Sequence, residues 1–161
     1  MDSRDIAYVV SRVMDGLSPK MTLDIAKALS ACVEEEARKM GVNAVICVSD
    51  AGARPVLVHS MDDAYIASFD IAVKKAYTVV SLKMPTSTLK SLAAPGGSLY
   101  GIQHTNDGQI VIFGGGDPLS IDGKIVGGLG VSGGTEEQDT ALSAYGASVF
   151  YEIIENFRKG K

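Results

Sequence analysis

Two overlapping motifs that could carry chemistry lie in the glycine-rich stretch from residue 127 to residue 139, GGLGVSGGTEEQD. The letters G-L-G-V-S-G match the G-x-G-x-x-G pattern, in which the backbone of a tight turn holds the pyrophosphate of a dinucleotide. The letters G-V-S-G-G match the G-x-S-x-G elbow, which presents a nucleophilic serine, here Ser132. Each motif needs its own surroundings, and these can be checked along the chain.

The surroundings do not support a dinucleotide site. The helix expected after the motif begins with Glu136, Glu137 and Asp139. Three carboxylates therefore lie at the helix N-terminus, where the negatively charged pyrophosphate would have to bind. Their repulsion offsets the attraction of the helix dipole, so we do not expect a dinucleotide.

The order of residues along the chain does not support a nucleophile elbow. In hydrolases with this elbow, the acid and then the histidine follow the serine. Both histidines of this chain, His59 and His104, precede Ser132. We therefore attribute the match to a glycine-rich strand end.

The glycines themselves still need an explanation, since nine of the eighteen fall between Gly114 and Gly134. Glycine weakens a strand and usually marks the close approach of another backbone or of a ligand. Two explanations remain open: a tight contact with a helix or another subunit, and the wall of a ligand pocket. Directly after the glycines, residues 135–138 fit a capping box with Thr135 as N-cap and Gln138 as its partner.

The expected elements alternate between helices and pairs of strands. Apolar residues at helical spacing predict helices at about 3–15, 22–40, 64–82, 86–92 and 136–158. Apolar, β-branched runs predict strands at 43–49, 55–60, 109–113 and 124–132. Thr22 and Asp63 are the expected N-caps of the second and third helices. Short turns force antiparallel neighbours, so the order predicts an α+β fold with an antiparallel sheet flanked by helices.

Composition excludes several classes of protein. The chain has 161 residues, a formal net charge of -4 and no Trp, so we expect neither a basic surface nor a stacking platform for nucleic acid. The sequence has no apolar run long enough to predict a membrane span. Cys32 and Cys47 are expected to be reduced core thiols. We expect a cytoplasmic protein in which residues 1–20 form an amphipathic helix and linker and residues 21–161 form one domain.

Several segments together resemble a known family. They are FGGGDPLSIDGKIVGGLGVSGGTEEQD (113–139), VSDAG (48–52), MDDA (61–64), KAYT (75–78) and PT (85–86). This set is similar to the GlcG/HbpS-like family, which includes the C-terminal domain of PduO-type corrinoid adenosyltransferases. The resemblance covers about residues 22–158. Ser60 and Asp63 depart from the family pattern, which commonly has Arg and Gly at these two positions.

The resemblance implies a profilin-like fold with a five-stranded antiparallel sheet, homo-oligomers and association with haem or a corrinoid. Adenosyltransferase chemistry belongs to the other domain of PduO and is not carried over. With the glycine cluster, the resemblance predicts a tetrapyrrole pocket near residues 75–78 and 113–134. Its expected lining is Lys75, Thr78, Gly114, Gly115, Gly116, Asp117, Gly128, Gly130 and Ser132.

The two imidazoles that could ligate iron or cobalt are His59 and His104. For each of them a surface position is the simpler explanation. Helix packing and surface exposure likewise explain Thr78 and Lys75 without a ligand.

Our leading hypothesis is therefore an accessory, non-catalytic homo-oligomer that binds a tetrapyrrole. One rival is an enzyme that acts on a small metabolite, with Lys75, Asp117 or Glu136 as acid or base. Another is a purely structural oligomer, in which the glycines serve subunit contact.

The segment at residues 3–15 resembles the peptides that target enzymes to bacterial microcompartments for diol or glycerol metabolism. It could equally dock on its own domain or on a neighbouring subunit, because so short a helix is marginal alone. Its balanced charges do not favour a membrane surface. A microcompartment shell or enzyme is thus a candidate partner, and the inside of a microcompartment a candidate location.

Overall fold

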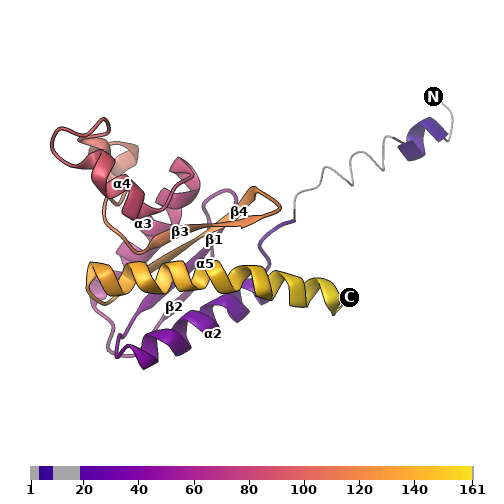
Figure 1. Cartoon of the computed structure of the whole chain (residues 1–161), viewed down its shortest axis with the longest axis horizontal. Helices are drawn as coiled ribbons and strands as arrows, with labels where there is room; N and C mark the ends of the chain where they lie inside the picture. The colour runs from indigo at the N-terminus through magenta and orange to yellow at the C-terminus, as the bar shows by residue number, and fades with distance from the viewer. Residues whose placement is uncertain (1–3, 9–18, 161) are drawn as a thin grey trace.

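The computed structural model describes residues 4–8 and 19–160 (Figure 1). Residues 4–8 are helical, and the rest of the predicted helix at 3–15, with most of the linker, lies outside the described residues. The principal elements are α2 (Leu23–Lys39), β1 (Val45–Asp50), β2 (Pro55–Ser60), α3 (Ile66–Leu82), α4 (Thr86–Ala93), β3 (Gly116–Ile121), β4 (Lys124–Ser132) and α5 (Glu136–Lys159). Two short 3-10 helices, Ile102–His104 and Asn106–Gly108, lie in the connection between α4 and β3.

Among the described residues, four strands form one antiparallel sheet in the order β2-β1-β4-β3. The central pair, β1 and β4, aligns Val45 with Ser132 and Asp50 with Gly127. This confirms the α+β class with an antiparallel sheet flanked by helices. The expectation of five strands is wrong, because the sheet has four. The profilin-like assignment stays a prediction.

The strand predicted at 109–113 is also wrong. Ile110 and Val111 are buried, but Val111 donates its backbone N–H to the Thr78 hydroxyl at the end of α3. The strand beside β4 is instead β3, which starts three residues after the predicted strand and pairs with β4 from Gly116 onward. A short apolar run indicates that a segment is buried, but it does not determine the secondary structure of that segment.

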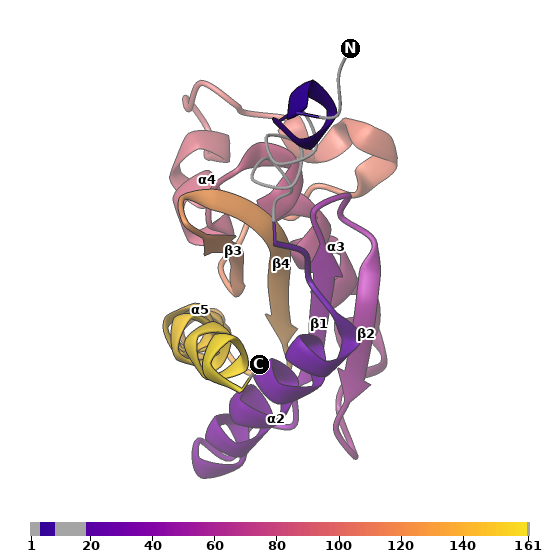
Figure 2. The ribbon, with the colours of Figure 1, turned by 90° about the vertical axis from the view of Figure 1, so that its right-hand side faces the viewer.

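The helices lie on both faces of the sheet (Figure 2). Helices α2 and α5 pack side by side on one face, and α3 crosses the other. The larger core lies under α2 and α5, and its fully buried side chains include Leu29, Val33, Ile46, Val48, Leu129 and Leu142. This arrangement brings the α2–β1, β2–α3 and β4–α5 connections to one end of the sheet.

The ends of the helices follow the predicted caps in two cases of three. Thr22 accepts a hydrogen bond from the backbone of Ile25, and Thr135 with Gln138 forms the predicted capping box. Asp63 does not cap α3, which begins after Tyr65 with no side-chain cap. Asp63 instead has a left-handed backbone at φ 62°. A tight turn, closed by the N–H of Ala64 on the carbonyl of Met61, therefore separates it from the helix.

Candidate functional site

Lys75, predicted to bind a ligand, is fully buried between α3 and the sheet. Its ammonium donates to the Val131 carbonyl at 2.7 Å and to the Asp139 carboxylate at 3.0 Å. The same nitrogen lies 4.9 Å from the centre of the Phe113 ring. Burial lowers the pKa of Lys75, and the neighbouring Asp139 acts against this shift. These contacts join α3 to β4 and α5.

Asp139 completes this buried pair from the first turn of α5. One carboxylate oxygen accepts from Lys75, and the other accepts the Gly134 N–H at 2.8 Å. Burial raises the pKa of Asp139, while Lys75 and the backbone N–H groups oppose the rise. Desolvation of both charges is thus offset by direct contact and by hydrogen bonds, as a buried ion pair requires.

The glycines of residues 114–116 bring the backbone close to this pair. Gly115 has φ 111°, and a side chain there would place its Cβ 2.5 Å from the Lys75 ammonium. The N–H of Gly114 donates to Glu136, and the N–H of Gly116 donates to the Thr86 hydroxyl. All three predicted glycines therefore lie at the junction of α3, β3 and α5.

Gly128 and Gly130 lie in β4 beneath α3. A Cβ on Gly130 would be 2.0 Å from the Ala72 carbonyl oxygen, and one on Gly128 would be 2.6 Å from that of Ala76. No side chain fits at such distances, so these glycines let the helix backbone approach the strand. Tight helix contact, one of the two explanations from the sequence, accounts for both positions.

The remaining predicted side chains also have internal partners. Thr78 donates to the Lys74 carbonyl, Asp117 accepts from the Ser143 hydroxyl at 2.6 Å, and Ser132 pairs with Ser68 at 3.1 Å. Burial raises the pKa of Asp117, and the Ser143 hydrogen bond acts against this rise. The assignment of these side chains and of the glycines to a ligand stays a prediction.

The two histidines lie apart from the Lys75–Asp139 pair. His59, on edge strand β2, places Nε2 2.9 Å from a Glu34 carboxylate oxygen of α2. His104 is exposed in the 3-10 helix Ile102–His104. Over residues 4–8 and 19–160, no group of three or more His, Cys, Asp or Glu side chains is placed to hold a metal ion. Ligation of iron or cobalt by either histidine stays a prediction.

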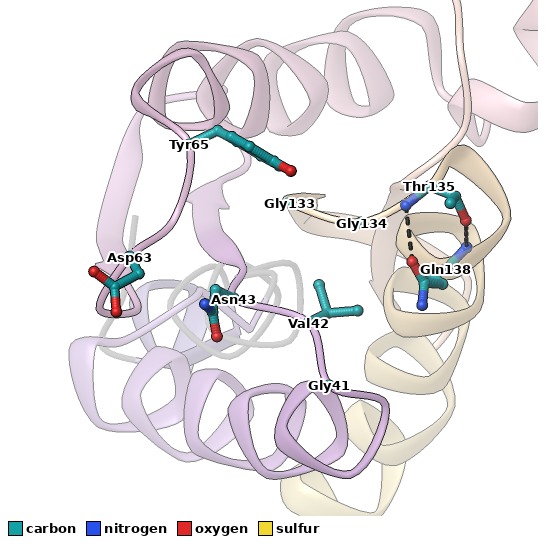
Figure 3. Close-up of a pocket in the computed structure, with 9 residues that line it drawn as sticks. All are labelled: Gly41, Val42, Asn43, Asp63, Tyr65, Gly133, Gly134, Thr135 and Gln138. Carbon is teal, nitrogen blue, oxygen red and sulfur yellow. Dashed lines mark hydrogen bonds between the residues drawn. The ribbon is translucent and has the colours of Figure 1, made fainter.

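A cavity of about 440 Å³ lies where the glycine run leaves the sheet (Figure 3). Three connections form it: α2–β1, β2–α3 and β4–α5. The lining residues are Gly41, Val42, Asn43, Asp63, Tyr65, Gly133, Gly134, Thr135 and Gln138. The last two glycines of the stretch at residues 127–139, Gly133 and Gly134, therefore line a cavity.

Tyr65 is the aromatic residue of this cavity. Its side chain is 73% exposed, and the ring extends from the start of α3 toward the β4–α5 connection (Figure 3). Tyr65 is not among the residues predicted for the site, because an aromatic residue at the start of an apolar helix resembles a core residue. The available signal in the sequence was the pair of acidic residues in MDDAY, just before Tyr65. In the structure, a left-handed turn at Asp63 places Tyr65 outside the core.

Tyr65 gives the cavity one side chain of a type that can ligate haem iron, and the rest of the lining is mostly small or polar. A phenolate oxygen is one of the axial ligands that proteins supply to haem iron. The exposed Tyr65 ring adds a flat apolar surface, and the cavity volume falls in the range of small-molecule and cofactor sites. The Asp63 carboxylate, also in the lining, disfavours a propionate beside it.

Comparison with known proteins identifies the family. The sequence model described as "Haem degrading protein HbpS-like" matches residues 21–148. The chain belongs to this HbpS-like family. The resemblance deduced from the glycine-rich block is thereby confirmed.

Two relatives of this HbpS-like chain show how far the similarity extends. An uncharacterized 15.0 kDa protein from the dhaT-dhaS intergenic region of Citrobacter freundii is 44% identical over 133 residues, which are 83% of this chain and 94% of that protein. The corrinoid adenosyltransferase PduO of Salmonella typhimurium is 40% identical over 115 residues, which are 71% of this chain but 34% of PduO. The chain thus matches about one third of PduO.

A solved structure of the PduOC:Heme complex also has this fold. It superposes with a TM-score of 0.78 at 34% sequence identity, covering 81% of this chain and 94% of that one. In the described parts of the present chain, no helix combines the length and the apolar character needed to cross a bilayer.

Proposed function

We propose that this HbpS-like chain binds haem in the cavity between the α2–β1, β2–α3 and β4–α5 connections. The observation that carries the proposal is the likeness to the PduOC:Heme complex, which extends over most of both chains. The position and chemistry of Tyr65 support the choice of cavity. Bound haem would supply iron-centred redox or ligand-binding chemistry, and the protein would supply the pocket and an axial ligand.

Tyr65 is the residue that would hold the haem iron in this proposal. Its side chain is exposed in the cavity wall, whereas His59 is already paired with Glu34 and His104 lies in the connection between α4 and β3. Val42 and the Tyr65 ring supply apolar contact. Gly133 and Gly134 let the β4–α5 connection pack closely, because the Asn43 backbone and the Gln138 side chain occupy the space that a Cβ would take.

A haemin titration of the purified protein, followed by visible absorption, tests this proposal. Tyr65→Phe keeps the ring and removes the oxygen, so we expect it to weaken haem binding by about tenfold or more and to change the ferric spectrum. His59→Gln and His104→Gln are the matched controls and should bind as the unchanged chain does. An unchanged spectrum on adding haemin would refute haem binding. Loss of binding in only one histidine variant would show that this histidine, and not Tyr65, ligates the haem iron.

The same titration with cobalamin separates a corrinoid from haem. Corrinoid binding was predicted with haem from the sequence and is the second tetrapyrrole candidate. A spectral change with haemin and none with cobalamin is the expected result. Saturable binding of cobalamin alone would reverse the assignment.

We also propose that the chain works as a homo-oligomeric accessory protein and not as an enzyme. The side chains of the enzymatic alternative have partners within the fold: Lys75 with Asp139, Asp117 with Ser143, and Glu136 with Gly114 and Lys90. A cytoplasmic location inside a microcompartment, reached through residues 3–15, remains a proposal that rests on the sequence of that segment.

A further inference from the structure

An apolar stripe runs along the outer side of α3. Helix α3 buries Ser68, Ala72, Lys75, Ala76, Thr78 and Val79 against the rest of the protein. Ile66, Phe69, Val73 and Tyr77 follow one another at spacings of three, four and four residues, so they lie along one line of the helix. We call these four residues the α3 stripe.

The α3 stripe is exposed most at its N-terminal half. Ile66 is 97% exposed and Phe69 is 52% exposed, while Val73 and Tyr77 are partly buried. Val73 packs in part against the core beneath α3, and the Tyr77 hydroxyl accepts a hydrogen bond from Asn106. The exposed anchors are therefore Ile66 and Phe69, and large apolar side chains gathered in water mark an interaction surface. Aromatic and aliphatic anchors of this kind carry most of the binding energy in protein interfaces.

The charges beside the stripe indicate what covers it. Asp70 and Lys74 lie next to the stripe and form an ion pair of 3.0 Å within the helix. Parallel helices would place each charge beside its own copy. Antiparallel helices related by a two-fold axis would instead place Asp70 beside the partner subunit's Lys74, and Lys74 beside the partner subunit's Asp70.

The apolar residues fit the same arrangement. An axis near residues 71 and 72 brings together positions whose numbers add up to about 143. Ile66 then faces the partner's Tyr77, and Phe69 faces the partner's Val73. A large side chain meets another apolar one at each level, and opposite charges meet at the centre. The stripe is therefore self-complementary in apolar character and in charge.

We infer that the α3 stripe is the contact between two copies of this chain, packed through antiparallel α3 helices. This inference rests on the proposed self-association and names its surface. The stripe is a different surface from the proposed haem cavity, although Ile66 directly follows the cavity residue Tyr65 in the chain.

Charge reversal tests the pairing directly. Asp70→Lys places two lysines against each other on either side of the central axis, and Lys74→Asp places two aspartates there. We expect each variant alone to raise the dissociation constant of the dimer by more than about tenfold in sedimentation experiments. An equimolar mixture of the two variants should associate again, because the lysine introduced in one variant then faces the aspartate introduced in the other. Lys27→Asp on α2 and Glu152→Lys on α5 make the same charge changes at exposed positions elsewhere and should have no effect.

The mixture also excludes a folding artefact, since each variant loses the internal ion pair whether or not the other is present. Ile66→Lys is a second variant that places a charge in the stripe at a position with almost no folded-state contact. It should also weaken association while circular dichroism shows an unchanged fold.

Three results would overturn the inference in different ways. Association that survives Ile66→Lys and both reversals would refute the α3 surface and leave self-association standing. Variants that dissociate and do not recover on mixing would refute the antiparallel pairing. A monomeric unmodified protein at all concentrations would refute self-association itself and assign the stripe to a different partner. Haemin titration of the same samples shows separately whether the proposed haem site is intact.

Discussion

The Lys75 ammonium and the Asp139 carboxylate lie 3.0 Å apart, at a point where neither side chain reaches solvent. Lys75 comes from the middle of α3, on one face of the sheet, and Asp139 from the first turn of α5, on the other. The pair therefore connects the two helical layers past the end of the central strand β4. It also holds the glycine-rich β4–α5 connection, since Asp139 accepts the N–H of Gly134.

This pair makes single and double substitutions behave differently. Lys75→Met or Asp139→Leu alone leaves an unpaired buried charge, so each should lower the free energy of unfolding by about 3–5 kcal/mol. The double variant removes both charges and should lose clearly less than the sum of the two. Urea unfolding at one fixed protein concentration measures all three. Strictly additive losses would show that the two charges do not depend on each other.

The glycines beneath α3 give a second prediction. Gly130→Ala would place a methyl group 2.0 Å from the Ala72 carbonyl oxygen, so helix and strand must separate. We expect a loss of about 1–3 kcal/mol in the free energy of unfolding, in the range found for overpacked cores. Gly160→Ala is the matched control, because its Cβ meets the nearest atom at 3.5 Å at the end of α5. Equal stability of the two variants would contradict the close contact between α3 and β4.

The two cysteines give a third prediction. Cys47 is fully buried in β1, and burial raises the pKa of its thiol to about 12. Cys32 is partly exposed in α2. Because the thiolate is the reactive form, an alkylating reagent should modify Cys32 in the folded protein and reach Cys47 only after denaturation. Mass spectrometry of the unchanged protein shows whether Cys32 is modified in the folded state, and the Cys32→Ser variant, treated before and after adding denaturant, isolates Cys47. Rapid native labelling of Cys47 would contradict the prediction.

Most of the fold could be predicted from periodicity and capping. The helices around Leu29 and Leu142, the hairpin at Pro55 and the Thr135 capping box depend on local patterns, and the structure has them where the sequence places them. The strand predicted around Ile110 was wrong because the backbone of this segment hydrogen-bonds to the distant Thr78 hydroxyl and not to a partner strand. Such a contact between residues far apart leaves no periodic trace in the sequence.

The candidate site was harder to predict for a related reason. The glycines of residues 128–130 were recognised as unusual, but a glycine needed for a helix backbone and a glycine needed for a ligand look alike in sequence. The burial of Lys75 depends on Asp139, 64 positions later, so its residue type alone indicated a surface lysine. Tyr65 was missed because only the turn at Asp63 turns it toward the cavity.

The pH dependence of stability gives the last prediction, through Asp117. Burial raises the pKa of its carboxyl group above the ordinary value of 3.8, although the Ser143 hydrogen bond opposes this. In the pH range between these two values the folded protein holds more protons than the unfolded chain. The stabilising contribution of Asp117 is therefore complete below pH 3.8 and is lost as the pH rises through the folded pKa.

Asp117→Asn should remove this dependence, because asparagine carries no charge and can still accept the Ser143 hydrogen bond. We expect the free energy of unfolding of the variant to rise relative to that of the unchanged protein as the pH increases from below 3.8 to neutrality. Urea unfolding at several pH values measures the difference. A difference for Asp117→Asn that shrinks with rising pH would mean that the carboxylate is stabilised in the fold, through contacts stronger than the cost of its burial.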